Sequence, residues 1–101
     1  MPENTNITPQ LKSLAGFAQR AGLIINGREK LKRHLRSLQC IILSTELSKN
    51  SLREAQHDYN CPMYHCFTTA EIESLFGLKN TKILGLKQNQ LSKNIEAMLA
   101  K

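Results

Sequence analysis

Residues 8 to 43 read TPQLKSLAGFAQRAGLIINGREKLKRHLRSLQCIIL, and this stretch decides the fold class. Thr8 followed by Pro9 is typical of a helix start, because threonine caps free N–H groups and proline fits the first helical turn. Apolar residues then recur at helical spacing until Gly22, which predicts the helix end. These residues are Leu11, Leu14, Phe17, Ala18 and Ala21. Short apolar runs at 23–25 and 40–43 predict two strands.

The rest of the chain continues the alternation of helices and short strands. Ser51 with Glu54, and Thr68 with Glu71, have the spacing of capping boxes and predict two further helix starts. Strands are predicted at 63–67 and 82–86, before a last helix whose apolar face is Leu91, Ile95, Met98 and Leu99. This order predicts an α/β fold in which helices cover both faces of a sheet. The strand order within the sheet is not readable from periodicity.

The segment from Arg28 to Arg36 contains five cations and one acid, Glu29. Leu31, Leu35 and Leu38 share the spacing of one helical face, so we expect a helix with buried leucines and solvated cations. It begins directly after the turn Asn26-Gly27, where free N–H groups and cations meet at one exposed point. Phosphate is the natural partner of such a point, which makes nucleic acid the first hypothesis. The alternative is a charged face that contacts only water.

The chain has 101 residues and a net charge of +6, which suits one domain with a polyanionic partner. Residues 1–36 contain seven cations and two acids, so five of the six net charges arise in the first third. Aromatic residues make up only 5%, and tryptophan is absent. A protein that stacks successive bases of a single strand is therefore disfavoured, and structured RNA fits the composition better.

The N-terminal residues indicate neither export nor membrane insertion. The first ten are polar and lack the order of a signal peptide, and no apolar run approaches the roughly 20 residues of a membrane span. Three cysteines without an export signal predict reduced thiols in the cytoplasm. We expect a single monomeric domain over residues 1–101, of which about the first eight are flexible.

Metal-binding and catalytic patterns are not found in the sequence. The cluster His57, Cys61, His65 and Cys66 does not have the spacing of a zinc site, and a strand at 63–67 would direct the last two side chains to opposite faces. There is no nucleophile elbow, phosphate-binding loop or dinucleotide glycine pattern. We therefore expect no enzyme, no cofactor and no metal.

The string LAGFAQRAG at residues 14–22, with Gly27 five positions later, resembles the kink-turn-binding ribosomal protein family typified by archaeal L-seven-Ae. The resemblance is closest to the short bacterial YlxQ-like branch and extends from about Leu11 to Leu99. It implies a three-layer αβα sandwich with a mixed, roughly four-stranded sheet and no catalysis. It also implies that the helix after the first strand enters the widened major groove of a bent RNA, where side chains read sheared G·A pairs.

The resemblance assigns the RNA-binding residues position by position. Gly27 matches the turn glycine of the family, Arg33 its helix lysine, and Glu46 an acidic residue near the RNA. The full predicted set is Asn26, Gly27, Arg28, Glu29, Lys30, Arg33, Glu46 and Thr68. Glu29 and Lys30 occupy the positions where kink-turn readers carry Asn-Glu. Glu29 can still accept from a guanine, whereas Lys30 is a donor only.

The sequence thus predicts a non-enzymatic, ribosomal-protein-like chain that binds structured RNA, with kink-turn RNA as the specific candidate. The runner-up is an interaction module that keeps the fold and binds a protein or a ribosomal surface. The missing Asn-Glu pair keeps this second hypothesis open.

Overall fold

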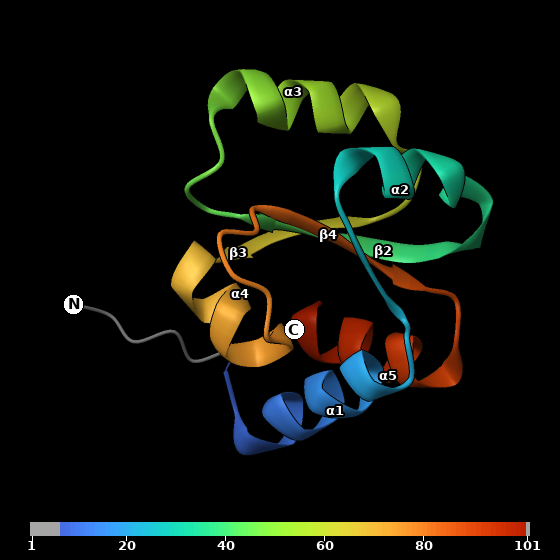
Figure 1. Cartoon of the computed structure of the whole chain (residues 1–101), viewed down its shortest axis with the longest axis vertical. Helices are drawn as coiled ribbons and strands as arrows, with labels where there is room; N and C mark the ends of the chain where they lie inside the picture. Colours follow the sequence, from blue (N-terminus) through green and yellow to red (C-terminus); the bar gives the residue numbers. More distant parts are fainter. Residues whose placement is uncertain (1–6, 101) are drawn as a thin grey trace.

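A computed structural model describes residues 7–100, in which helices cover both faces of one mixed sheet (Figure 1). The prediction of a flexible N-terminus concerns mainly residues 1–6, which lie outside the described range. The elements in chain order are α1 (Pro9–Arg20), β1 (Ile24–Asn26), α2 (Arg28–Arg33), a 3-10 turn (Leu35–Ser37), β2 (Leu38–Ser44), α3 (Lys49–Asp58), β3 (Met63–Phe67), α4 (Thr69–Phe76), β4 (Ile83–Lys87) and α5 (Gln90–Leu99).

The sheet has four strands in the order β1-β4-β2-β3. β4 runs antiparallel to both of its neighbours, β1 and β2, whereas β2 and β3 are parallel. The predicted αβα sandwich with a mixed, four-stranded sheet is therefore confirmed. The strand at 63–67 is found as predicted, and β1 and β4 each begin one residue later than expected.

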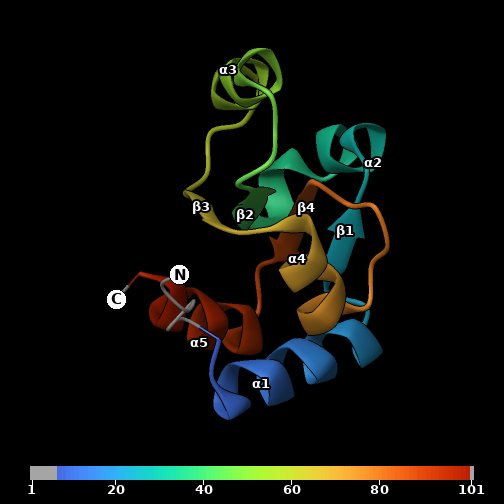
Figure 2. The same cartoon turned by 90° about the vertical axis from the view of Figure 1, so that its left-hand side faces the viewer.

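Two apolar cores hold the layers together, one on each face of the sheet. Helices α1, α4 and α5 cover one face, and α2 and α3 cover the other (Figures 1 and 2). The inner strand β2 serves both cores, because Cys40 and Ile42 belong to the first and Ile41 and Leu43 to the second. Successive side chains of a strand point to opposite faces, so a strand buried on both sides reads as a continuous apolar block.

The ends of α1 are as predicted, but its apolar face is not. The Thr8 hydroxyl accepts from the Leu11 N–H at 3.1 Å. At the other end, Gly22 has a φ of 72° while the Leu23 N–H donates to the Ala18 carbonyl, the bond that closes many helices. Phe17, predicted on the buried face, is 53% exposed. The helix packs through a narrow stripe of small and apolar side chains, Leu11, Ala15 and Ala18.

One of the two predicted capping boxes is confirmed. Thr68 and Glu71 cap α4 reciprocally, through bonds of 2.8 and 3.1 Å. The box at Ser51 is wrong, because α3 begins one turn earlier. There the Ser48 hydroxyl accepts from the Ser51 N–H, which makes Ser48 the capping residue.

The basic helix is shorter than the leucine spacing predicts. α2 ends at Arg33, and His34 leaves helical geometry with a φ of −114° and a ψ of 22°. Leu31 is buried as expected, but Leu35 is 43% exposed. Leu38 belongs to β2, where it pairs with Lys87. Leu38 is therefore a strand residue of the sheet, whereas the spacing of the leucines predicts it on the face of the basic helix.

Candidate nucleic-acid interface

Three separate segments of the predicted site meet at one end of the sheet. β1, β2 and β3 run in the same direction, because both antiparallel pairings involve β4. The carboxyl ends of these three strands therefore lie at the same end of the sheet, which we call the carboxyl edge. Gly27 follows β1, Glu46 lies two residues after β2, and Thr68 follows β3. The predicted residues are thus brought to one edge, spread across the width of the sheet.

Gly27 forms the turn from which α2 starts. Its φ of 103° is a conformation that L side chains rarely adopt, and a Cβ there would have no neighbour within 4 Å. The Gly27 carbonyl accepts from the Leu31 N–H at 3.0 Å, so the first helical bond closes directly after the turn. Asn26 beside it is exposed. The turn is open to a close approach of another molecule.

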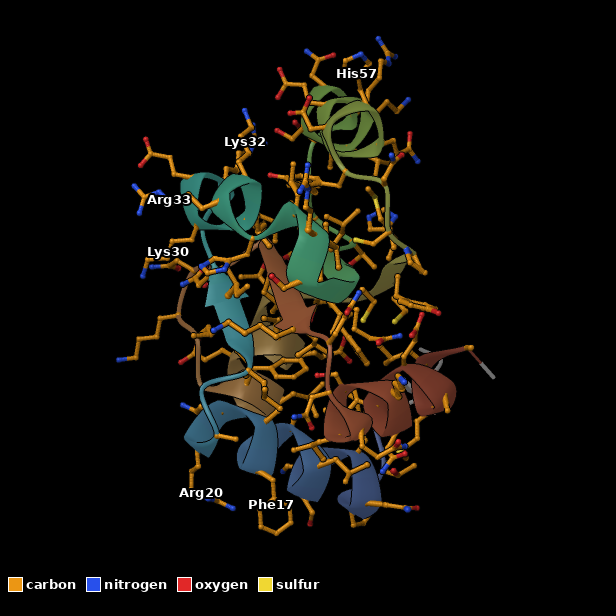
Figure 3. The ribbon with its side chains drawn as sticks, turned by 90° about the vertical axis from the view of Figure 1, so that its right-hand side faces the viewer. Phe17, Arg20, Lys30, Lys32, Arg33 and His57 are labelled. Atoms are coloured by element: carbon orange, nitrogen blue, oxygen red, sulfur yellow. The ribbon has the colours of Figure 1, made fainter. Side chains whose placement is uncertain are left out.

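The cations of α2 divide into two groups. Arg28 Nη1 lies 2.9 Å from Glu54 Oε1, and Lys32 Nζ lies 3.9 Å from Asp58 Oδ2, so two residues one turn apart face α3. Lys30 and Arg33 extend away from α3 (Figure 3) and make no ion pair within residues 7–100. The exposed positive charge available to a ligand is therefore that of Lys30 and Arg33, while Arg28 already has an anionic partner.

Glu46 and Thr68 stabilise the junction between β3 and α4. Glu46 Oε1 accepts from the Thr69 N–H at 3.0 Å, and the Glu46 N–H donates to the Ser44 hydroxyl. The hydroxyls of Ser44 and Thr69 lie 2.9 Å apart. The hydrogen bonds from Thr69, and more weakly the charge of Lys82, lower the pKa of the Glu46 carboxyl from its ordinary 4.5. Glu46 thus orients the loop between β3 and α4.

The lowered pKa predicts a pH-dependent contribution of Glu46 to stability. A carboxyl with a depressed folded pKa stabilises the fold above its unfolded pKa, and this stabilisation disappears as the pH falls through the folded value. We expect wild type to exceed Glu46→Gln in urea midpoint at about pH 7, and this difference to shrink as the pH falls through the lowered pKa of Glu46. The isosteric amide removes the charge alone. A difference that does not change with pH would contradict the assignment.

The structure adds two cations that the sequence did not single out. β4 begins at the carboxyl edge between β1 and β2, and the preceding segment carries exposed Lys79 and Lys82. The Lys82 carbonyl accepts from the Ser44 N–H at 2.8 Å, which fixes this segment beside Glu46. The sequence analysis gave these lysines no role, because only the strand order places them between Gly27 and Glu46.

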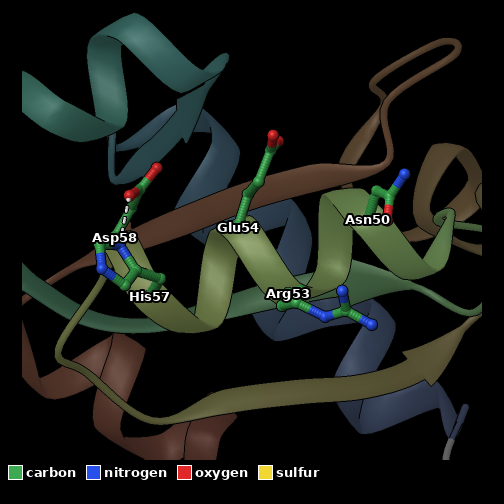
Figure 4. Close-up of a pocket in the computed structure, with 5 residues that line it drawn as sticks. All are labelled: Asn50, Arg53, Glu54, His57 and Asp58. Atoms are coloured by element: carbon green, nitrogen blue, oxygen red, sulfur yellow. Dashed lines mark hydrogen bonds and ion pairs between the residues drawn. The ribbon is translucent and has the colours of Figure 1, made fainter.

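A hollow of about 380 Å³ lies elsewhere, over α3 (Figure 4). Its lining comes from one face of that helix and comprises Asn50, Arg53, Glu54, His57 and Asp58. These side chains are all exposed and carry charges of both signs. His57 Nδ1 and Asp58 Oδ1 lie 3.2 Å apart, and Glu54 is paired with Arg28. The mixed charge does not favour phosphate, so this hollow is not part of the candidate site.

The cysteines and histidines show no metal-site geometry in the part of the chain that the structure describes. No three His, Cys, Asp or Glu side chains of residues 7–100 could together hold a metal ion. His65 is exposed whereas Cys66 packs on the core, so the two point to opposite faces, as predicted. Burial raises the pKa of the Cys40 thiol to about 12.

No helix of residues 7–100 combines the length and apolarity that crossing a membrane requires.

Known proteins resemble the chain over most of its length. No protein-family model matches it. It is 27% identical over 92 residues to the RNA-binding protein YlxQ of Enterococcus faecium, covering 86% of this chain and 88% of the relative.

Two solved structures share the arrangement of the elements. A protein of unknown function from Bacillus halodurans superposes with a TM-score of 0.75 at 20% identity, over 93% of this chain and 100% of that one. The 15.5kD RNA binding protein of Giardia lamblia gives a TM-score of 0.66 at 10% identity, over 93% and 88%. At these identities the two structures establish that the fold is shared.

Proposed function

We propose that this protein is a non-enzymatic RNA-binding protein of the kink-turn-binding ribosomal type, closest to the YlxQ-like branch, that acts as a cytoplasmic monomer. The observation that carries the proposal is the placement of Lys30 and Arg33. They are exposed, unpaired within the described residues, and lie just past an open glycine turn at the carboxyl edge. The name of the Enterococcus faecium relative supports RNA as the partner.

The geometry suggests a role for each residue. The turn at Gly27 lets the RNA backbone approach closely, with exposed Asn26 beside it. Lys30 and Arg33 neutralise phosphates, since exposed cations supply most of the sequence-independent affinity for nucleic acid. Glu29 is the candidate acceptor for a guanine edge.

The remaining residues support this contact or extend it. Arg28 joins the RNA only by leaving Glu54, so its contribution is smaller than that of a free cation. Glu46 and Thr68 hold the neighbouring loop in shape rather than supplying charge. Lys79 and Lys82 extend the positive surface along the carboxyl edge towards that loop.

The finer part of the proposal is specificity for kink-turn RNA. Titrating wild type with a kink-turn RNA and with a plain duplex of equal length, at several salt concentrations, tests it. Four phosphate contacts would give a log–log salt slope of about −3 to −4. We expect tighter binding to the bent RNA.

The other outcomes of this titration discriminate between the hypotheses. Equal affinity for both RNAs with the same slope would leave charge-driven RNA binding without kink-turn reading. Binding to neither RNA would reject the proposal in favour of an interaction module for a protein surface, the function that the altered Glu29-Lys30 pair also permits.

A further inference from the structure

Phe17 is a large aromatic side chain on the outer surface of α1, away from both cores. Its 53% exposure is the highest among the large apolar side chains of residues 7–100. Figure 3 shows the ring pointing away from the ribbon. Single exposed apolar residues are common on protein surfaces, so the exposure by itself indicates nothing.

The second observation is the position of Arg20, one helical turn further on. Its guanidinium carbon lies 4.9 Å from the centroid of the Phe17 ring, within the range of a cation–π contact. The arginine also covers Gly16, where a Cβ would lie 3.6 Å from Arg20 Nη1. A planar cation and an aromatic ring are thus held together in solvent, and α1 contains no acid that could compete for the arginine.

We propose that Phe17 and Arg20 form a stacking platform for one unpaired nucleotide of the RNA whose structured part binds at the carboxyl edge. This proposal rests on the proposed function. Aromatic rings and guanidinium planes are the groups on which proteins stack splayed-out bases, and such stacking accepts any base because every base has a π face. A single platform is also consistent with the low aromatic content, which disfavours binding of a long single strand.

The platform is continuous with the candidate interface through β1. This edge strand joins the C-terminal end of α1 to the start of α2, with only a glycine turn at each junction (Figures 1 and 2). Arg20 and Arg28 are eight positions apart in sequence, so the backbone between them spans at most about 28 Å. In Figure 3, Lys30 and Arg33 project from α2, and Arg20 projects from α1 at the other end of β1. An RNA strand that leaves the α2 site can therefore run along β1 to reach Phe17.

The test compares one structured RNA with and without an unpaired tail of about six nucleotides. We expect the tail to raise the affinity of wild type by about fivefold or more, the effect of one stacked base. Phe17→Ala and Arg20→Ala should each abolish this gain without changing the affinity for the tailless RNA, whereas Phe17→Tyr should retain it. Leu35→Ala is the matched control, because Leu35 is the other large exposed apolar residue and lies in the basic segment.

Each remaining outcome also decides the question. A tail that adds nothing in wild type, or a gain that survives Phe17→Ala, overturns the platform. Equal losses for both RNAs in Phe17→Ala would do the same, since the residue would then act on the fold or on another contact. If wild type binds neither RNA, the proposed function fails, and the platform fails with it because it requires an RNA held at the carboxyl edge. Binding of the tailless RNA without any gain from the tail rejects the platform alone.

Discussion

Replacing Leu31 with alanine is expected to lower the free energy of unfolding by about 2–5 kcal/mol, a large part of the roughly 5–15 kcal/mol typical of a domain. Leu31 is fully buried and is the only buried residue of α2, a helix of six residues. So short a helix has little stability of its own and depends on packing. The substitution should therefore loosen the element that carries the candidate site. Urea denaturation of wild type and variant measures the difference.

The control for this prediction is Leu35→Ala, which should lower the free energy of unfolding much less than Leu31→Ala does, because 43% of this side chain is exposed. A second test uses Gly85, which lies directly beneath Leu31. A Cβ at Gly85 would lie 2.5 Å from Leu31 Cδ2 and 2.8 Å from Leu38 Cδ2. Gly85→Ala should destabilise wild type by overpacking and cost less in the Leu31→Ala background, which gives non-additivity. Strict additivity would mean that the two residues do not share this contact.

Removing the two cations of α2 that have no ion pair within residues 7–100, as Lys30→Ala/Arg33→Ala, is expected to weaken RNA binding about ten- to hundredfold near physiological salt. Each phosphate contact that is lost should also reduce the steepness of the log–log salt dependence by about 0.9, so the two together remove nearly two units. Fluorescence anisotropy of a labelled RNA at several salt concentrations measures both quantities. The unfolding midpoint should hardly move, since both side chains are exposed.

Two control variants separate the effect of Lys30 and Arg33 from the effect of net charge. Lys12→Ala/Lys93→Ala removes the same charge from α1 and α5, on the opposite face of the sheet, and should leave the slope nearly unchanged. Arg28→Ala/Glu54→Ala deletes an ion pair without changing net charge and should have a smaller effect than the loss of Lys30 and Arg33. If Lys12→Ala/Lys93→Ala weakened binding equally, only net charge would matter, and the site would be wrong.

Local signals in the sequence predicted most of the fold. Thr8, and Thr68 with Glu71, mark helix starts because a hydroxyl or carboxylate satisfies N–H groups within the next turn. The strand at 63–67 likewise lies between two such local signals, Pro62 before it and Thr68 after it. Errors arose where two local solutions compete. Ser48 and Ser51 are both of a residue type that favours the N-cap position, and the helix begins after the first of them.

The candidate site was less predictable, because its geometry depends on contacts between distant residues. The sequence places Arg28 at the helix start but gives no sign that Glu54, 26 positions away, would hold it. Lys79 and Lys82 join the site only through the strand order β1-β4-β2-β3, which periodicity does not encode. Phe17 was placed in the core because its spacing fits a helical face, whereas α1 buries only a narrow stripe.

The pairing of Arg28 with Glu54 has a consequence for any ligand that recruits this arginine. The incoming anion exchanges places with the Glu54 carboxylate, so the energy of the lost ion pair is subtracted from the energy of the new contact. The exchange also removes one of the two ion pairs that join α2 to α3 within residues 7–100. Binding of an anion at α2 is therefore expected to increase amide hydrogen exchange in α3.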